Sequence, residues 1–106
     1  MYVIIGGSSF IGVHTAEEFL KQGSEILVTG RNDKYREYYE ERGVSYLNLD
    51  LSRDEDFQQL PQHGVDGVIL LAGLLPANAP VNLDIDENAA DYFEINTKGT
   101  IRVLEY

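Results

Sequence analysis

The sequence predicts an α/β protein with a doubly wound parallel sheet, in which four strands follow the order 3-2-1-4 with flanking helices. Apolar runs of strand length alternate four times with segments of helical length or spacing. The runs are continuously apolar, as is typical of parallel strands covered on both faces. Parallel strands need helical crossovers, and right-handed crossovers place helices on both faces. The 106 residues are expected to form one domain, residues 1–106.

The N-terminal segment predicts a buried strand at Tyr2–Ile5 and a helix at Phe10–Gln22. Gly23 follows as the stop signal of this helix. Apolar residues recur at helical spacing and define a core-facing stripe that consists of Phe10, Val13, Ala16, Phe19 and Leu20.

The middle of the chain predicts a second strand at Glu25–Thr29 and a third at Val44–Leu49. A polar, tyrosine-rich helix at Asp33–Arg42 lies between them and is closed by Gly43.

After the third strand, Ser52 and Glu55 have the spacing of a capping box, which predicts a short helix that ends near Pro61. The remaining predicted segments are a fourth strand at Val65–Leu71, a loop at Leu74–Asp86 and a last helix at Glu87–Tyr106.

Composition excludes several classes of function. The net charge of −10 argues against a nucleic-acid partner, which would require a basic face. No apolar run is long enough to cross a membrane, and the N-terminus lacks the pattern of a signal peptide. The absence of cysteine excludes disulfides and thiolate metal sites, and His14 and His63 lack metal-ligand spacing. A cytoplasmic location is expected.

The stretch "VIIGGSSFIG" joins the first strand to the first helix. Gly6 permits a sharp turn, and Gly12 permits the helix to pass close to the sheet. The N–H groups that begin the helix have no helical partner, and they form a site for a pyrophosphate that needs no lysine. The alternative is a tight turn without a ligand. The candidate binding loop comprises Gly6, Ser8, Ser9, Phe10, Ile11 and Gly12.

"GGSSFIG" resembles the Gly-x-x-Gly-x-x-Gly loop of the extended short-chain dehydrogenase/reductases, the NAD(P)-dependent epimerase/dehydratase group. "LDL" at residues 49–51, "LLAG" at 70–73 and "INTKGTIRVLE" at 95–105 resemble further motifs of that family, in the same order. The resemblance implies a Rossmann-type fold that binds NAD(P). It also implies that Asp50 and Leu51 border the adenine. Leu71, Ala72 and Gly73 would pass under the cofactor.

Two positions of this resemblance remain open. Ser9 stands where the family has its middle glycine, and its hydroxyl either donates to a phosphate or caps the helix. The resemblance implies that Asn96 bonds the cofactor or the backbone near the pyrophosphate, while a purely structural asparagine is the alternative.

The tip of the second strand indicates the type of cofactor. An acidic residue there would bind the ribose 2′-hydroxyl of NAD, but the sequence has Thr29-Gly30-Arg31-Asn32. Arg31 favours NADP, because a guanidinium bonds a 2′-phosphate and stacks on adenine. The alternatives are that Arg31 faces solvent and that Asp33, which is close by, serves a ribose. Asn32 is included in the candidate site.

The catalytic Tyr-x-x-x-Lys pair of the family is missing, because Glu17, Gly30 and Glu94 stand four residues before the three lysines. We therefore expect the cofactor-binding part of an oxidoreductase that is inactive alone, whose complete form acts on a substrate such as a nucleotide sugar. The alternative is a naturally short, non-catalytic NAD(P)-sensing or partner-binding module.

Assembly is the last expectation. The fourth strand would lie at an edge of the sheet and is apolar on both faces. The last helix would place Tyr92, Phe93, Asn96 and Val103 against the sheet and leave other apolar residues in water. A homodimer is expected through this helix, the strand or both.

Overall fold

A computed structural model of the protein describes residues 1–73 and 89–106. Its sheet contains four parallel strands in the order β3-β2-β1-β4, which confirms the predicted topology. The strands are β1 (Tyr2–Ile5), β2 (Ile26–Gly30), β3 (Ser45–Asn48) and β4 (Gly67–Leu70). The predicted loop at Leu74–Asp86 lies outside the described residues.

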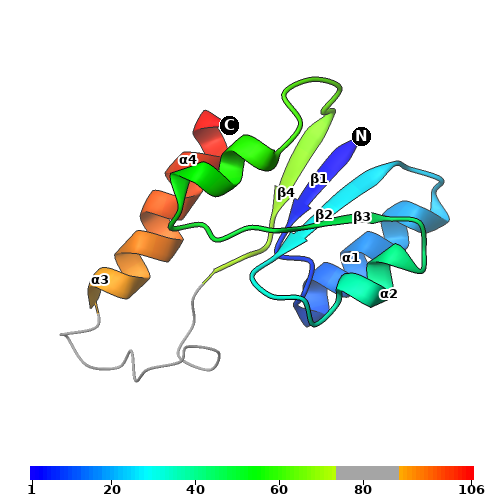
Figure 1. Cartoon of the computed structure of the whole chain (residues 1–106), viewed down its shortest axis with the longest axis horizontal. Helices are drawn as coiled ribbons and strands as arrows, with labels where there is room; N and C mark the ends of the chain where they lie inside the picture. Colours follow the sequence, from blue (N-terminus) through cyan, green and yellow to red (C-terminus); the bar gives the residue numbers. More distant parts are fainter. Residues whose placement is uncertain (74–88) are drawn as a thin grey trace.

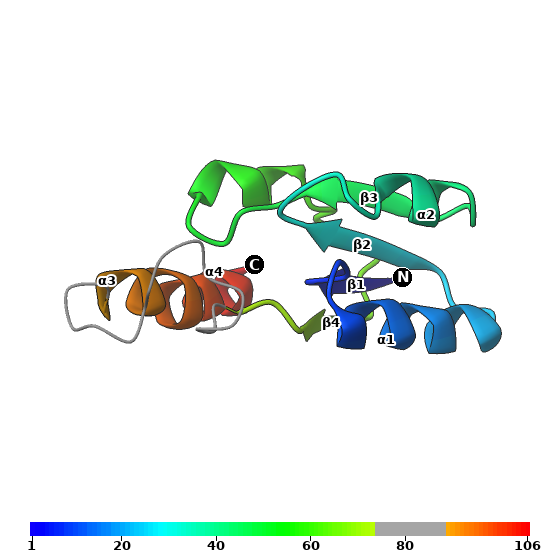
Figure 2. The ribbon, with the colours of Figure 1, turned by 90° about the horizontal axis from the view of Figure 1, so that it is seen from below.

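Helices cover both faces of the sheet, as Figures 1 and 2 show. One face carries α1 (Phe10–Lys21) and α2 (Arg36–Glu40). The other face carries the 3-10 helix η1 (Asp54–Gln59) and a C-terminal helical run (Figure 2). This run consists of α3 (Ala89–Tyr92), the π-helical η4 (Phe93–Lys98) and α4 (Gly99–Glu105). No helix in the described part of the chain is long and apolar enough to cross a membrane.

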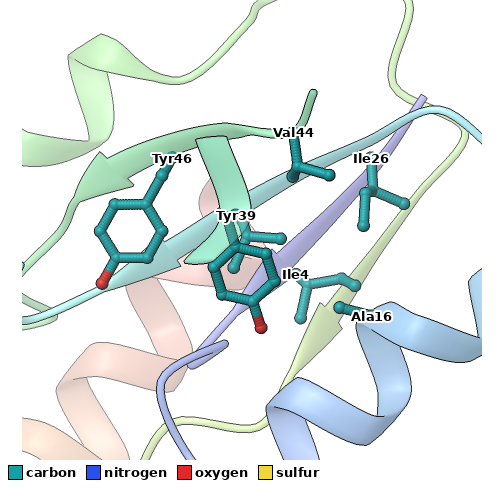
Figure 3. Close-up of a cluster of buried hydrophobic side chains, with 7 residues drawn as sticks. Ile4, Ala16, Ile26, Tyr39, Val44 and Tyr46 are labelled. Carbon is teal, nitrogen blue, oxygen red and sulfur yellow. The ribbon is translucent and has the colours of Figure 1, made fainter. Parts of the chain in front are cut away.

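Two hydrophobic clusters lie on opposite faces of the sheet, because alternate residues of each strand point to opposite sides. On the face of α1 and α2, Ile4, Ile26 and Val28 pack with Ala16 and with residues of α2 and β3. Figure 3 shows this cluster. The second cluster joins the other face to η1 and α4, and consists of Val3, Ile5, Leu27, Leu49, Leu51 and Leu60.

Two of the expected helices differ from the structure. The helix expected at Asp33–Arg42 is confined to α2. Its first residues form a turn instead, in which the side chain of Asn32 accepts a hydrogen bond from the N–H of Lys34. The capping box at Ser52 is wrong. The Ser52 hydroxyl donates to Asp50 Oδ1 over 2.6 Å, and η1 begins later, without a side-chain cap.

The core-facing stripes of two helices also need correction. Phe10 is 80% exposed, and its ring contacts the ring of His14 on the same helix, 4.5 Å between centroids, instead of the core. In the C-terminal run, Phe93 and Asn96 are exposed, whereas Ile95 and Val103 pack against the second cluster. The π-helical turn at η4 changes the spacing from 3.6 residues per turn, which shifts the face that meets the sheet. The side chain of Tyr92 lies outside what the structure describes.

Candidate functional site

The turn between β1 and α1 has no room for side chains. Gly6 has a φ of +101°, and a Cβ atom there would lie 2.5 Å from the backbone nitrogen of Ala72. A Cβ atom on Gly12 would lie 2.2 Å from the carbonyl oxygen of Gly6 and 2.7 Å from Gly7 Cα. Both positions therefore require glycine. The close contact expected between Gly12 and the sheet is a contact with the turn itself.

Ser9 caps α1. Its φ and ψ are −94° and 166°, its Oγ accepts a hydrogen bond from the N–H of Gly12, and its hydroxyl donates to the carbonyl of Gly6. The first backbone bond of the helix runs from the N–H of Val13 to Ser9. In the described part of the chain, the N–H groups of Ser9, Phe10 and Ile11 have no hydrogen-bond partner. The start of α1 thus presents three donors at the positive end of the helix dipole.

Backbone hydrogen bonds join the carboxyl ends of three strands at this turn. Gly6 and Gly7 both donate to the carbonyl of Thr29 at the end of β2, over 3.1 and 2.8 Å. Leu71 and Ala72, which follow β4, both donate to the carbonyl of Ile5. The turn therefore lies between the ends of β2 and β4. The strand order reverses here, because β2 and β3 lie on one side of β1 and β4 lies on the other. Ligands of open α/β sheets bind at such a switch point.

Tyr39 of α2 holds the turn from the other side. Its hydroxyl donates to the carbonyl of Gly7 over 2.6 Å, and the whole residue is buried. Burial raises the pKa of Tyr39 above its usual range, so the hydroxyl stays protonated and keeps its proton on this bond. Figure 3 shows Tyr39 beside Tyr46 of β3; the two rings stack with centroids 5.8 Å apart.

A cavity of about 770 Å³ opens at this end of the sheet. Its size is in the range of sites for small molecules and cofactors. It brings together most residues that the sequence indicated: Gly6, Ser8, Ser9, Phe10, Ile11, Arg31, Asn32, Leu51, Leu71, Ala72 and Gly73. Its lining also includes residues that sequence reasoning did not select: Ile5, Thr29, Gly30, Lys34, Leu49, Leu70 and Ile95.

Three predicted residues do not line the cavity. Gly12 packs beneath the turn. Asp50 binds its own loop, where it accepts hydrogen bonds from the N–H and the hydroxyl of Ser52. Burial alone would raise the pKa of Asp50, but the Ser52 hydrogen bonds and the charge of Arg31 lower it overall. Asn96 is exposed and lies beside Gly73, with its Oδ1 3.4 Å from the place of a Cβ on that glycine.

The charges around the cavity suit an anion. None of the described residues that line it carries a carboxylate, whereas Arg31 and Lys34 are cationic. The hydroxyl of Thr29 is buried and has no hydrogen-bond partner in the described part of the protein, and a bound ligand or water commonly satisfies such a group. Among the described residues, no group of histidine, cysteine or acidic side chains is arranged to hold a metal ion.

Comparisons with known proteins point to one family. The family model of the NAD dependent epimerase/dehydratase family matches residues 2–106. Among curated proteins, the bifunctional protein GAL10 of Candida maltosa is 24% identical over 98% of this chain and 71% of its own length.

Two solved structures extend this likeness. A complex of UDP-glucose 4-epimerase from Thermus thermophilus with NAD is 30% identical, with a TM-score of 0.71. A variant of ElxO with NADPH bound is 21% identical, with a TM-score of 0.75. Each match covers 99% of this chain, but the chain spans only 33% of the epimerase and 48% of ElxO.

The packing at Gly12 generates a test of the turn. In a helix interior, the replacement of glycine by alanine usually raises the free energy of unfolding by about 0.5–1 kcal/mol. Gly12→Ala is expected to have the opposite sign and to lower the free energy of unfolding by about 1–3 kcal/mol, because its methyl group meets backbone rather than a movable side chain. Urea denaturation followed by circular dichroism measures this. Glu18→Ala, at an exposed site of the same helix, is the control. A stabilised Gly12→Ala protein would contradict the geometry.

Proposed function

This chain belongs to the NAD-dependent epimerase/dehydratase family, and we propose that residues 1–106 bind the ADP part of a nicotinamide dinucleotide in the cavity beside the β1–α1 turn. The observation that carries this proposal is the start of α1. Three N–H groups without protein partners, at Ser9, Phe10 and Ile11, lie on a cavity that no described carboxylate lines. A pyrophosphate placed there would accept their hydrogen bonds.

The other residues of the cavity have roles that follow from their chemistry. Leu51 and Ile95 offer apolar contacts to an adenine ring, since both line the cavity and pack in the second hydrophobic cluster. Leu71, Ala72 and Gly73 bound the cavity on the side of β4. Asp50 supports the cavity indirectly, because it accepts the hydrogen bonds that hold the loop containing Leu51. Asn96 lies next to Gly73 and would adjoin the pyrophosphate side.

We favour NADP over NAD as the cofactor. The two residues that follow β2, Arg31 and Asn32, carry no carboxylate to bind a ribose 2′-hydroxyl. The next residue, Asp33, accepts a hydrogen bond from Arg36 and is not part of the cavity lining. Arg31 and Lys34 are both exposed and both line the cavity, so that two cations are available to a 2′-phosphate bound there. An arginine forms charge-assisted hydrogen bonds with such a group. The related structures that hold NAD and NADPH support a nicotinamide dinucleotide but not a choice between them.

The activity of the whole protein is a further proposal. A nicotinamide cofactor supplies hydride transfer when bound. We propose that this chain contributes the binding and orientation of the cofactor to an oxidoreductase that acts on a substrate such as a nucleotide sugar. The likeness to UDP-glucose 4-epimerase supports that substrate class. The chain contains no Tyr-x-x-x-Lys pair, so we expect no turnover from residues 1–106 alone.

Calorimetric titration with nucleotides tests the proposed site. We expect 2′,5′-ADP to bind more tightly than 5′-AMP, because only the former carries the 2′-phosphate. Arg31→Ala is expected to lower the affinity for 2′,5′-ADP by about ten- to a hundredfold, which corresponds to the loss of one charge-assisted hydrogen bond. The affinity for 5′-AMP should remain nearly unchanged.

Arg53→Ala is the matched control, because Arg53 is an exposed arginine that pairs with Glu55 and Asp56 outside the cavity lining. Equal losses for the two nucleotides in Arg31→Ala would show that Arg31 does not bind the 2′-phosphate. The absence of heat with ADP-ribose at millimolar concentration would contradict the binding site itself.

We also propose that the chain forms a homodimer. The C-terminal run exposes apolar side chains at Phe93, Ile101 and Leu104, of which Leu104 is 80% exposed. In addition, among the described strands β4 pairs only with β1 and forms an edge, and its Val68 is exposed. Apolar side chains exposed in this way are candidates for an interaction site. A second copy would cover the helix, the strand or both.

Sedimentation velocity at micromolar concentration tests the dimer. We expect a dimer for the unchanged chain and a shift toward monomer for Leu104→Glu, because a charge replaces the most exposed apolar residue of α4. The thermal midpoint of the dissociated variant reports whether the fold survives. A single monomeric species of the unchanged chain would rule out the proposal.

A further inference from the structure

Tyr46 lies directly beside the tip of β2. A Cβ atom placed on Gly30 would lie 2.1 Å from the hydroxyl oxygen of Tyr46 and 3.1 Å from Ser8 Oγ. Gly30 is the last residue of β2, and both Gly30 and Ser8 line the cavity. The Tyr46 hydroxyl therefore occupies the space into which any side chain at this strand tip would extend.

Tyr46 is held in this place by several contacts. The residue is 4% exposed, and its hydroxyl donates to the carbonyl of Asn32 over 2.6 Å. One neighbour is the stacked ring of Tyr39. Another is the guanidinium of Arg36, which lies 5.0 Å from the Tyr46 ring centre and donates to the Tyr46 carbonyl over 3.0 Å. A ring packed in this way does not move aside cheaply.

The hydrogen bond from Tyr46 to Asn32 restrains the backbone next to Arg31, which lines the cavity. Arg31 lies between Gly30, against which the Tyr46 hydroxyl packs, and Asn32, whose carbonyl it binds. The hydroxyl thus ties the chain on both sides of Arg31. The side chain of Asn32 adds a second bond to this turn, to the N–H of Lys34, which is the other cation of the cavity.

We propose that Tyr46 is a specificity-determining positioning residue, which acts through Gly30 and Asn32 and selects a ribose that carries a 2′-phosphate. It excludes a carboxylate from the tip of β2, and it fixes the turn that presents Arg31 to the cavity. This inference rests on the proposed dinucleotide site. Tyr46 does not line the cavity and makes no contact with the ligand; its effect passes through the backbone that it holds.

The test measures affinities for 2′,5′-ADP and 5′-AMP by calorimetry. Tyr46→Phe removes the hydroxyl and keeps the stacked ring. We expect its ratio of the two affinities to fall by about two- to tenfold, the value of one neutral hydrogen bond, through weaker binding of 2′,5′-ADP. Tyr38→Phe is the matched control, because Tyr38 belongs to the same aromatic cluster but donates to Glu17, away from the cavity.

A second variant tests the steric half of the proposal. Gly30→Ala places a methyl group against the Tyr46 hydroxyl and is expected to displace it, so this variant should lower the same ratio. The double variant should lose no more selectivity than either single one, because both changes act through one hydroxyl. Circular dichroism confirms that each variant is folded.

The outcomes separate the two proposals. If the unchanged chain binds neither nucleotide, the proposed site and this inference fail together. If it binds them and Tyr46→Phe changes both affinities equally or neither, the inference on Tyr46 alone is overturned. Additive losses in the double variant would likewise overturn the action through a shared hydroxyl.

Discussion

The close packing of backbone on backbone at the β1–α1 turn is the constraint on which the site depends. A side chain at Gly6 would meet the main chain of Ala72, and one at Gly12 would meet the carbonyl of Gly6. The neighbours in both cases are backbone atoms, which cannot move aside without moving the ends of the strands. Through this contact, the first turn of α1 is fixed against the β1–α1 turn. Ser9, Phe10 and Ile11, whose N–H groups have no hydrogen-bond partner in the described chain, line the cavity. The position of these donors therefore depends on the two glycines.

This arrangement explains how a chain with a net charge of −10 offers a place for an anion. Backbone donors at a helix N-terminus carry about half a positive charge and need no basic residue. Acidic groups near the cavity are bound elsewhere. Asp33 accepts a hydrogen bond from Arg36, which is the largest cause of its lowered pKa, and Asp50 accepts two from Ser52. The cavity lining itself holds only the cations Arg31 and Lys34 among its charged residues in the described chain.

Patterns within a short stretch of sequence were sufficient to predict the strand order and the glycine turn. They depend on local rules: apolar runs, glycine spacing and the handedness of crossovers. The errors arose where a competing side-chain contact replaced the expected one. The Ser52 hydroxyl donates to Asp50 instead of capping a helix, and the Phe10 ring contacts His14 instead of the core. The contacts of Tyr39 and Tyr46 with the turn and with Gly30 join residues far apart in sequence, and no periodicity in α2 or β3 indicates them.

The most direct test of the account is a map of backbone amide shifts during a titration with ADP-ribose and 2′,5′-ADP. The account predicts that ADP-ribose shifts the amides of Ser9, Phe10 and Ile11 most strongly, because those N–H groups would bind the pyrophosphate. The amide of Arg31 should respond to 2′,5′-ADP and much less to ADP-ribose. Saturable shifts confined to the C-terminal helices, with the amides at the start of α1 unchanged, would contradict the placement of the dinucleotide at this turn.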